Sequence, residues 1–115
     1  MKDGDKDRIR ELEMVLGVAL AAVKPEAHQS WKSLFGGAAF YADGVIFAAW
    51  FGEGLALKLP EDARDELMQI AGAVKPWAKE YVEVPPAFLE DPGLLEGWVE
   101  RSVDYVRAPK KRRRG

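Results

Sequence analysis

Three short apolar runs separated by turn residues occupy the middle of the chain, residues 33–59. They cover residues 38–42, 45–51 and 55–59. The first two are separated by Asp43-Gly44, a dipeptide that favours a two-residue hairpin because a type I′ turn needs positive φ at both central positions. The next turn, residues 52–54, has glycine at both ends, which also suits a tight reversal. The pattern predicts three consecutive antiparallel strands.

Alternation within these strands predicts how they are covered. Strict alternation divides the strand 45–51 into two apolar faces, one with Val45, Phe47, Ala49 and Phe51 and the other with Ile46, Ala48 and Trp50. Two apolar faces are typical of a central strand that is covered on both sides, or on one side and by a partner. In the strand 55–59 the three leucines share one face and Lys58 lies on the other, which predicts one drier and one wetter side.

The first segment of the chain has the apolar repeat of an amphipathic helix. In residues 5–23 the stripe is formed by Ile9, Leu12, Leu16, Ala19, Leu20 and Val23. Pro25 ends this helix, since the residue before a proline avoids the α region. Gly17 costs about 1 kcal/mol relative to alanine within a helix, and it either allows a close approach to the sheet or is simply tolerated.

The second half of the chain predicts a helix, a strand and a final helix. Residues 61–71 have a helical pattern that stops at Gly72. Residues 78–84 contain β-branched and aromatic types and predict a strand. The last helix is expected to begin with Asp91 as N-cap and Pro92 at the first helical position. It carries one apolar face of Leu95, Trp98, Val99, Ser102, Val103 and Val106.

These elements follow the order α-β-β-β-α-β-α and predict a two-layer α+β fold. We expect an antiparallel sheet of about four to five strands flanked by helices, with the long first and last helices together on one face. A chain of 115 residues has the length of one domain. The expected division is a single domain over residues 1–109 and a basic disordered tail over residues 110–115.

The composition excludes several kinds of site. The chain has no cysteine, which excludes disulfides, thiolate metal ligands and cysteine nucleophiles. His28 is its single histidine, so no metal, no cofactor and no catalytic residue is expected, and we expect no enzymatic activity. No apolar run is long enough to span a bilayer, and the polar N-terminal region lacks a secretory pattern. The expected location is the cytoplasm, without a membrane partner.

The charge is distributed unevenly along the chain. The net charge is −2, but five of the 17 basic residues are Lys110, Lys111, Arg112, Arg113 and Arg114. The rest of the chain, which we call the body, has 12 basic and 19 acidic residues and a net charge of −7. Such a run either binds nucleic acid or another polyanion through salt-sensitive phosphate contacts or serves only as a solubilising tail. An acidic body repels nucleic acid, so any such binding must be local.

An ordered set of segments resembles the N-terminal domain of the TfoX/Sxy proteins, small bacterial proteins named for a regulator of natural competence. The resemblance covers about residues 9–106 and is carried by Lys32-Ser33-Leu34-Phe35-Gly36-Gly37, by residues 41–48 with their Asp-Gly turn, by Leu55-Ala56-Leu57-Lys58-Leu59, and by Tyr81-Val82-Glu83-Val84-Pro85 followed by Leu89-Glu90-Asp91-Pro92. It implies an antiparallel sheet with flanking helices. It also implies a regulatory role linked to transcription or competence, although the regulators carry a second helical domain and this chain is expected to be a stand-alone domain.

Other polar patterns have plainer structural explanations. Gly36-Gly37 is expected to bend the chain into the sheet rather than to hold phosphate, because a phosphate loop must open a helix. His28 and nearby Glu26 lack a third ligand and are expected to lie in an exposed connector. Ser30 and Ser33 have no visible base, which argues against a hydrolase triad. The acidic residues Glu61, Asp62, Asp65 and Glu66 are expected to form a solvated helix face.

The aromatic residues favour protein interaction as the function of this chain. Trp77 follows a proline in an expected loop and is the best candidate for an exposed contact. We predict a partner surface that includes Ile46, Trp50 and Trp77, used for a protein partner or for self-association. Two alternatives remain: weak nucleic-acid binding through the tail, and binding of a small ligand between sheet and helices.

Overall fold

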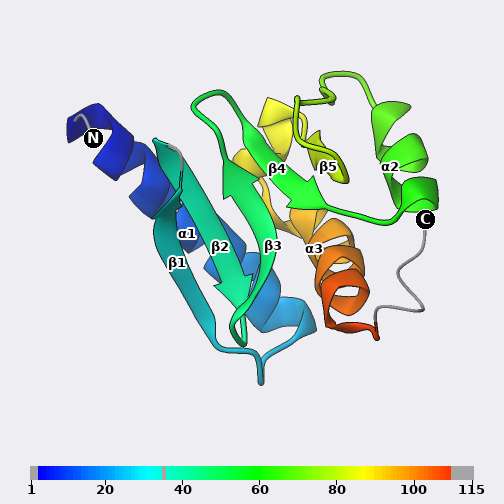
Figure 1. The fold of residues 1–115 in the computed structure, drawn as a ribbon, viewed down its shortest axis with the longest axis horizontal. Coiled ribbons are helices and arrows are strands. Elements are labelled where there is room, and N and C mark those ends of the chain that lie inside the picture. The colour runs from blue at the N-terminus through cyan, green and yellow to red at the C-terminus, as the bar shows by residue number, and fades with distance from the viewer. Residues whose placement is uncertain (1–2, 35, 110–115) are drawn as a thin grey trace.

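The protein is an antiparallel sheet with two long helices on one face. The computed structural model describes residues 3–34 and 36–109 (Figure 1). The strands of the described chain are β1 (Gln29–Leu34), β2 (Gly37–Ala42), β3 (Val45–Trp50), β4 (Leu55–Lys58) and β5 (Tyr81–Glu83). They lie side by side in sequence order, each antiparallel to the next. This meander has one strand more than the three consecutive strands predicted from the sequence, because residues 29–34 pair with β2 along their whole length.

Two long helices, α1 (Asp3–Val23) and α3 (Pro92–Arg107), cross behind the sheet and pack against each other (Figure 1). A short helix α2 (Glu61–Met68) follows β4, and a 3₁₀ turn η1 (Pro86–Leu89) precedes α3. The predicted two-layer α+β class is confirmed. Asp91 is the N-cap of α3, as predicted, because its Oδ1 accepts a hydrogen bond from Gly93 N at 3.1 Å.

The main core lies between the sheet and this helix layer. The predicted stripe of α1 is buried there except for half-buried Val23, and most of the predicted face of α3 is buried too, with Trp98 half-buried. From the sheet come Phe40, Phe47 and the leucines of β4. Near Gly17, an added Cβ would stand 3.3 Å from the end of the Gln29 side chain on β1, whose Nε2 donates to Glu13 O at 3.0 Å. Because this neighbour is the end of a flexible side chain, the close-approach explanation for Gly17 stays a prediction.

A β-bulge in β3 overturns the predicted division of that strand into faces. Phe40 pairs with Ala48 but the next residue, Tyr41, pairs with Ile46, so that Phe47 is the extra residue. The extra residue shifts the alternation by one position. Phe47, Ala48 and Trp50 therefore all lie in the core on the helix side. The outer face of β3 carries Ile46 and Ala49 instead, and the prediction that Ile46 shares a face with Ala48 and Trp50 was wrong.

Ser102 on α3 satisfies the backbone of this bulge. Its hydroxyl donates to Phe47 O at 2.8 Å, and both partners are buried. Ser102 is fully buried, whereas the rest of its helix face is apolar. An unpaired buried carbonyl costs free energy comparable to a lost hydrogen bond. The serine on an otherwise apolar face is therefore explained by the bulge opposite it.

The hairpin between β2 and β3 forms as the sequence predicts. Asp43 and Gly44 have φ of 51° and 81°, which the type I′ turn requires. The turn is tied to the connector before β1, because His28 N donates to Asp43 Oδ1 at 2.9 Å and Asp43 N donates to His28 O at 2.8 Å. Arg107, at the end of α3, lies 3.7 Å from Asp43 Oδ2. The turn thus joins the two layers at this end of the molecule.

Two predicted elements are shorter in the structure. The helix predicted over residues 61–71 ends at Met68, since Gln69 N and Ile70 N bond three residues back instead of four and Gly72 has φ of 97°. The strand predicted over residues 78–84 is limited to Tyr81–Glu83. Glu80 has φ of 73°, a left-handed conformation that interrupts extended backbone just before β5.

We expect Ser102→Ala to lower the free energy of unfolding by about 1–3 kcal/mol, because it leaves the buried Phe47 carbonyl without a donor. Chemical denaturation followed by circular dichroism measures the loss. Ser33→Ala on the exposed strand β1 is the matched control and should change stability by less than about 0.5 kcal/mol. Equal stability of the two variants would show that the bulge does not depend on this hydrogen bond.

Gly37 begins β2 at a place where no side chain fits. A Cβ added to Gly37 would lie 1.9 Å from Trp50 O on β3, so we expect Gly37→Ala to destabilise the fold by about 3 kcal/mol. Gly97 on α3 has nothing within 4 Å of such a Cβ, and Gly97→Ala should stabilise by about 0.5–1 kcal/mol. Thermal unfolding of the two variants should move in opposite directions; a tolerated Gly37→Ala would contradict the close approach.

Candidate interaction sites

The outer face of the sheet, away from α1 and α3, has a floor of small side chains. One row of cross-strand partners runs over all five strands and consists of Lys32, Ala39, Ala49, Ala56 and Glu83. The three alanines in the middle are fully buried. Alanine gives a flat floor that larger neighbouring side chains cover. At the β1 end, the Lys32 ammonium lies 5.6 Å from the centroid of the Tyr41 ring.

Aromatic rings from three places in the chain cover part of this floor: Phe51 directly after β3, Trp77 between α2 and β5, and Tyr81 at the start of β5. Ala78 and Tyr81 join Ala49 and Ala56 in a second, small apolar cluster. The Phe51 ring packs 5.0 Å from the Trp77 ring and 5.8 Å from the Tyr81 ring, measured between centroids. These distances are typical of favourable aromatic pairs. The outer face is therefore half covered by its own chain, with Phe51 at the centre of the covering group.

Trp77 is the most exposed member of this group. It is 75% exposed, although its ring rests on Phe51. Exposed apolar side chains are frequent in this stretch, since Met68 and Val74 are also exposed. The expectation that Trp77 is an exposed aromatic is confirmed.

The other two residues of the predicted partner surface do not join Trp77. Ile46 is half-buried and lies near the start of β3, whereas Phe51, which supports Trp77, directly follows the strand's last residue. Trp50 is 4% exposed and faces the helices, and its Nε1 donates to Glu53 O at 3.3 Å. Trp50 therefore cannot belong to an outer surface, because the bulge at Phe47 turns it into the core.

Burial perturbs two ionisable groups on the outer face. Burial, followed by the nearby charge of Glu80, raises the pKa of Tyr81 to about 12. The pKa of Glu83 is also raised, chiefly by burial and secondarily by the negative charge of Glu53. The space around the Glu83 carboxylate is tight, since an added Cβ at Gly54 would lie 3.0 Å from its Oε1. Tyr81 is buried and Glu83 is half-buried on this face of the sheet.

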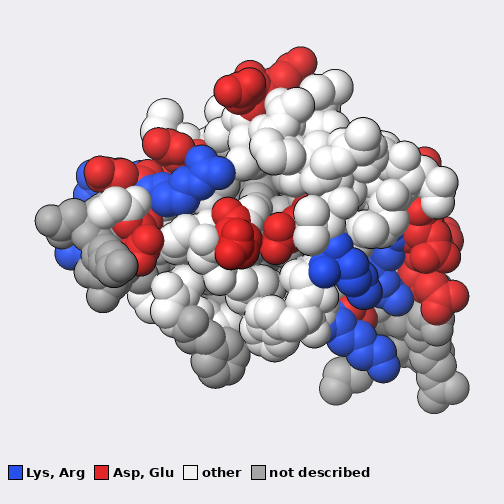
Figure 2. Space-filling view, turned by 90° about the horizontal axis from the view of Figure 1, so that it is seen from above, with Lys and Arg blue, Asp and Glu red and all other residues white. Residues whose placement is uncertain are grey.

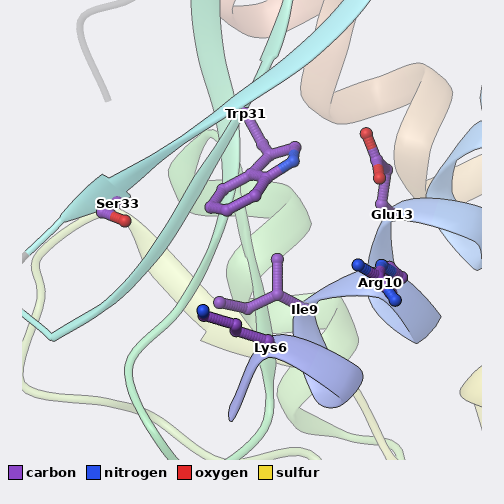
Figure 3. Close-up of a pocket in the computed structure, with 6 residues that line it drawn as sticks. All are labelled: Lys6, Ile9, Arg10, Glu13, Trp31 and Ser33. Carbon is purple, nitrogen blue, oxygen red and sulfur yellow. The ribbon is translucent and has the colours of Figure 1, made fainter. Parts of the chain in front are cut away.

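A second candidate site is a pocket between α1 and the edge strand β1. Its volume is about 490 Å³, and it is lined by Lys6, Ile9, Arg10, Glu13, Trp31 and Ser33. Figure 3 shows the Trp31 ring reaching from β1 toward Lys6 and Ile9 of α1, with Arg10 and Glu13 beside them. Trp31 and Ser33 lie on the helix side because Trp31 pairs with Phe40 of the core. The pocket combines a buried aliphatic floor, one aromatic wall and a cationic rim.

The sequence analysis left open a small-ligand site between sheet and helices but named none of the residues that line this pocket. Lys6 and Arg10 stand four residues apart, which places them on one side of a helix. That spacing was visible in the sequence, but the pairing of residues 29–34 as a strand beside α1 was not.

The other polar residues considered in the sequence analysis have structural roles that explain their positions. His28 is exposed in the connector, as expected. Gly36-Gly37 joins β1 to β2, so this pair leads into a strand and not a helix. Of the acidic residues on α2, Glu66 pairs with Arg101 at 2.7 Å. The run Lys110, Lys111, Arg112, Arg113 and Arg114 lies outside the described residues.

Two structural features are absent over residues 3–34 and 36–109. No group of three or more histidine, cysteine, aspartate or glutamate side chains gathers there in a way that could hold a metal ion. None of the helices in that part of the chain has the length and apolar character needed to span a bilayer.

The raised pKa of Glu83 predicts a pH-dependent stability. A raised pKa means that the folded protein holds this proton more tightly than the unfolded chain, so the contribution of Glu83 is most favourable below its ordinary value of 4.5 and is lost as the pH rises through the folded-state pKa. Glu83→Gln should therefore raise the melting temperature at pH 7 and have little effect near pH 3.5. The same substitution at exposed Glu90 is the control. A gain that does not depend on pH would contradict the effect.

Comparison with known proteins agrees with the resemblance of the sequence segments. The TfoX N-terminal domain model matches residues 21–106 of the 115-residue chain, from the end of α1 through α3. No curated protein and no solved structure matches the chain significantly. The matched region contains the whole sheet and α3, the helix that satisfies the bulge of β3. The chain therefore belongs to the TfoX N-terminal domain family.

Proposed function

We propose that this protein is a non-enzymatic, cytoplasmic interaction module that binds a protein partner through the surface around Trp77. The observation that carries the proposal concerns the Trp77 side chain. It is 75% exposed, and its ring packs against the ring of Phe51. Membership of the TfoX N-terminal domain family supports a regulatory type of role. A link to transcription or competence follows from the family resemblance and forms part of the proposal.

The arrangement of the rings favours binding over a purely structural role. Tryptophan is enriched among the residues that contribute most to protein interfaces. A large side chain that is already positioned loses little conformational freedom when a partner covers it. The Phe51 ring positions Trp77 in this way, and half-exposed Val74 (49%) belongs to the same segment of the chain. Trp77 thus has the exposure and the fixed position that are typical of an anchor residue in a protein interface.

Charged residues flank Trp77 in the sequence, since Lys75 and Lys79 are both exposed. Interface centres are depleted of charged residues, while charges remain at the rim, so these two lysines suit the rim of an interface centred on Trp77. Figure 2 shows one face of the molecule, on which basic side chains gather toward the two ends and acidic side chains lie both at the ends and between them. The proposal of a non-enzymatic role rests on the described side chains: His28 is exposed, and its backbone, not its ring, makes the hydrogen bond to Asp43.

We expect Trp77→Ala to abolish capture of the native partner while leaving the fold intact. Tagged wild type and variants, produced in the native cell, are purified and their bound proteins are identified and quantified by mass spectrometry. Met14→Ala is the matched control, because Met14 is an apolar side chain that is 70% exposed on α1, away from Trp77 in the sequence. A partner retained by Met14→Ala and reduced at least about tenfold by Trp77→Ala supports the proposal, since an anchor of this kind contributes about 2 kcal/mol or more.

Self-association is tested by sedimentation of the same proteins over a range of concentrations. A dimer of wild type that Trp77→Ala converts to monomer would identify the partner as a second copy. Capture of the same proteins by wild type and Trp77→Ala, with a monomer throughout, would overturn the proposed surface.

A further inference from the structure

The strand β1 is an open edge of the sheet. It pairs with β2 along all six of its residues and with no other segment among residues 3–34 and 36–109. The opposite edge of the sheet, at β5, is partly paired. On the edge of β5 away from β4, Val74 and Glu83 exchange backbone hydrogen bonds of 2.7 and 3.1 Å. An exposed edge presents unpaired backbone N–H and C=O groups that can pair with another extended chain. The fold protects one edge and leaves the other available.

The helix beneath this edge extends beyond it. Figure 1 shows the N-terminal half of α1 projecting past β1, whereas its C-terminal half lies behind the sheet. The pocket lined by Lys6, Ile9, Trp31 and Ser33 lies at this place, between the projecting helix and the edge strand. Its volume of about 490 Å³ is in the range of sites that bind ligands, about 300–1,000 Å³. A sixth strand beside β1 would therefore lie over α1 and could place side chains in the pocket.

The charged residues that line the pocket favour an acidic strand as its ligand. Lys6 and Arg10 line it, and neither makes an ion pair within the part of the chain that the structure describes. Arg8 on the same helix is different, since its guanidinium contacts Glu11 at 3.0 Å. With Glu13 also at the rim, the pocket carries a net positive charge on a body whose net charge is negative. Lys6 and Arg10 attract the carboxylates of an acidic ligand to this rim.

We propose that the groove between α1 and β1 binds an extended acidic peptide of another protein, which adds to the sheet as a sixth strand. Backbone hydrogen bonds to β1 would supply affinity, and one apolar side chain would enter the pocket against Ile9 and Trp31. Carboxylates on the peptide would lie near Lys6 and Arg10. This groove is on the helix side at the β1 edge, whereas Trp77 is on the outer face, so the two surfaces are independent.

Two other occupants fit the charges less well. The chain's own last residues include Lys110 to Arg114, which Lys6 and Arg10 would repel. A second copy that paired edge to edge through β1 would bring two copies of the same cationic rim toward each other, and like charges in an interface are unfavourable.

The probe for this groove is a fluorescein-labelled decapeptide in which valine and glutamate alternate and one central glutamate is replaced by phenylalanine, so that the phenylalanine and the glutamates share one face of the extended strand. Fluorescence polarisation with the full chain should show saturable binding that weakens with added salt, and no binding of the same peptide with lysine in place of glutamate. The double variant Lys6→Glu/Arg10→Glu should weaken binding by about tenfold or more. The single reversals Lys6→Glu and Arg10→Glu should each weaken binding, and Arg8→Glu, which makes the same charge change as either of them outside the pocket, is their control. Trp77→Ala should leave the peptide affinity unchanged.

Methylation of the peptide backbone separates strand addition from simple occupation of the pocket. Alternate amides of an extended strand point to opposite sides. N-methylation of one alternate set should abolish binding, while methylation of the other set should leave it unchanged. Equal affinity for both sets, equal affinity of the lysine peptide, or an undiminished affinity of the Lys6→Glu/Arg10→Glu variant would overturn the proposal. A wild-type dimer that these charge reversals strengthen would also overturn it, because a second copy would then occupy the edge.

Discussion

The hydrogen bond from Ser102 to the carbonyl of Phe47 joins the two layers of the fold at the point where the sheet is irregular. A bulge provides one residue that the neighbouring strand cannot pair. In a buried strand its carbonyl needs a donor from elsewhere, and α3 provides that donor from a position 55 residues away. The position of α3 across β3 and the alternation of β3 therefore depend on each other. Without the bulge, Trp50 would turn away from the core that it now fills.

The bulge also decides what the outer face contains. Because Phe47, Ala48 and Trp50 all turn inward, the outer side of the central strands is left with alanines that cannot form a thick core. A thin aromatic layer covers them, in which Phe51, directly after β3, contacts both Trp77 and Tyr81 from the chain after α2. Such a layer buries some groups enough to raise their pKa, as at Tyr81 and Glu83, but leaves Trp77 largely in solvent.

The two candidate surfaces differ in the kind of recognition they offer. The Trp77 surface presents a large apolar side chain whose partner must supply a complementary pocket. The groove at β1 presents backbone groups, a pocket and a cationic rim, and it therefore favours an extended acidic segment. They lie on opposite faces of one small sheet, so a single domain of the TfoX N-terminal family has two separate places at which partners could be held.

Local patterns in the sequence determined the elements and the class of the fold. Asp43-Gly44 requires positive φ and forms its turn, Asp91 caps α3, and the apolar stripe of α1 faces the core, because each depends on residues close in sequence. The resemblance to the family likewise rests on ordered local segments. Tertiary structure alone decided the bulge at Phe47, the inward orientation of Trp50 and the pocket between α1 and β1. Each of these depends on contacts between residues that are distant in sequence. Strict alternation is the only local guide to the faces of a strand, and it assigns Trp50 to the wrong face because the strand contains one extra residue.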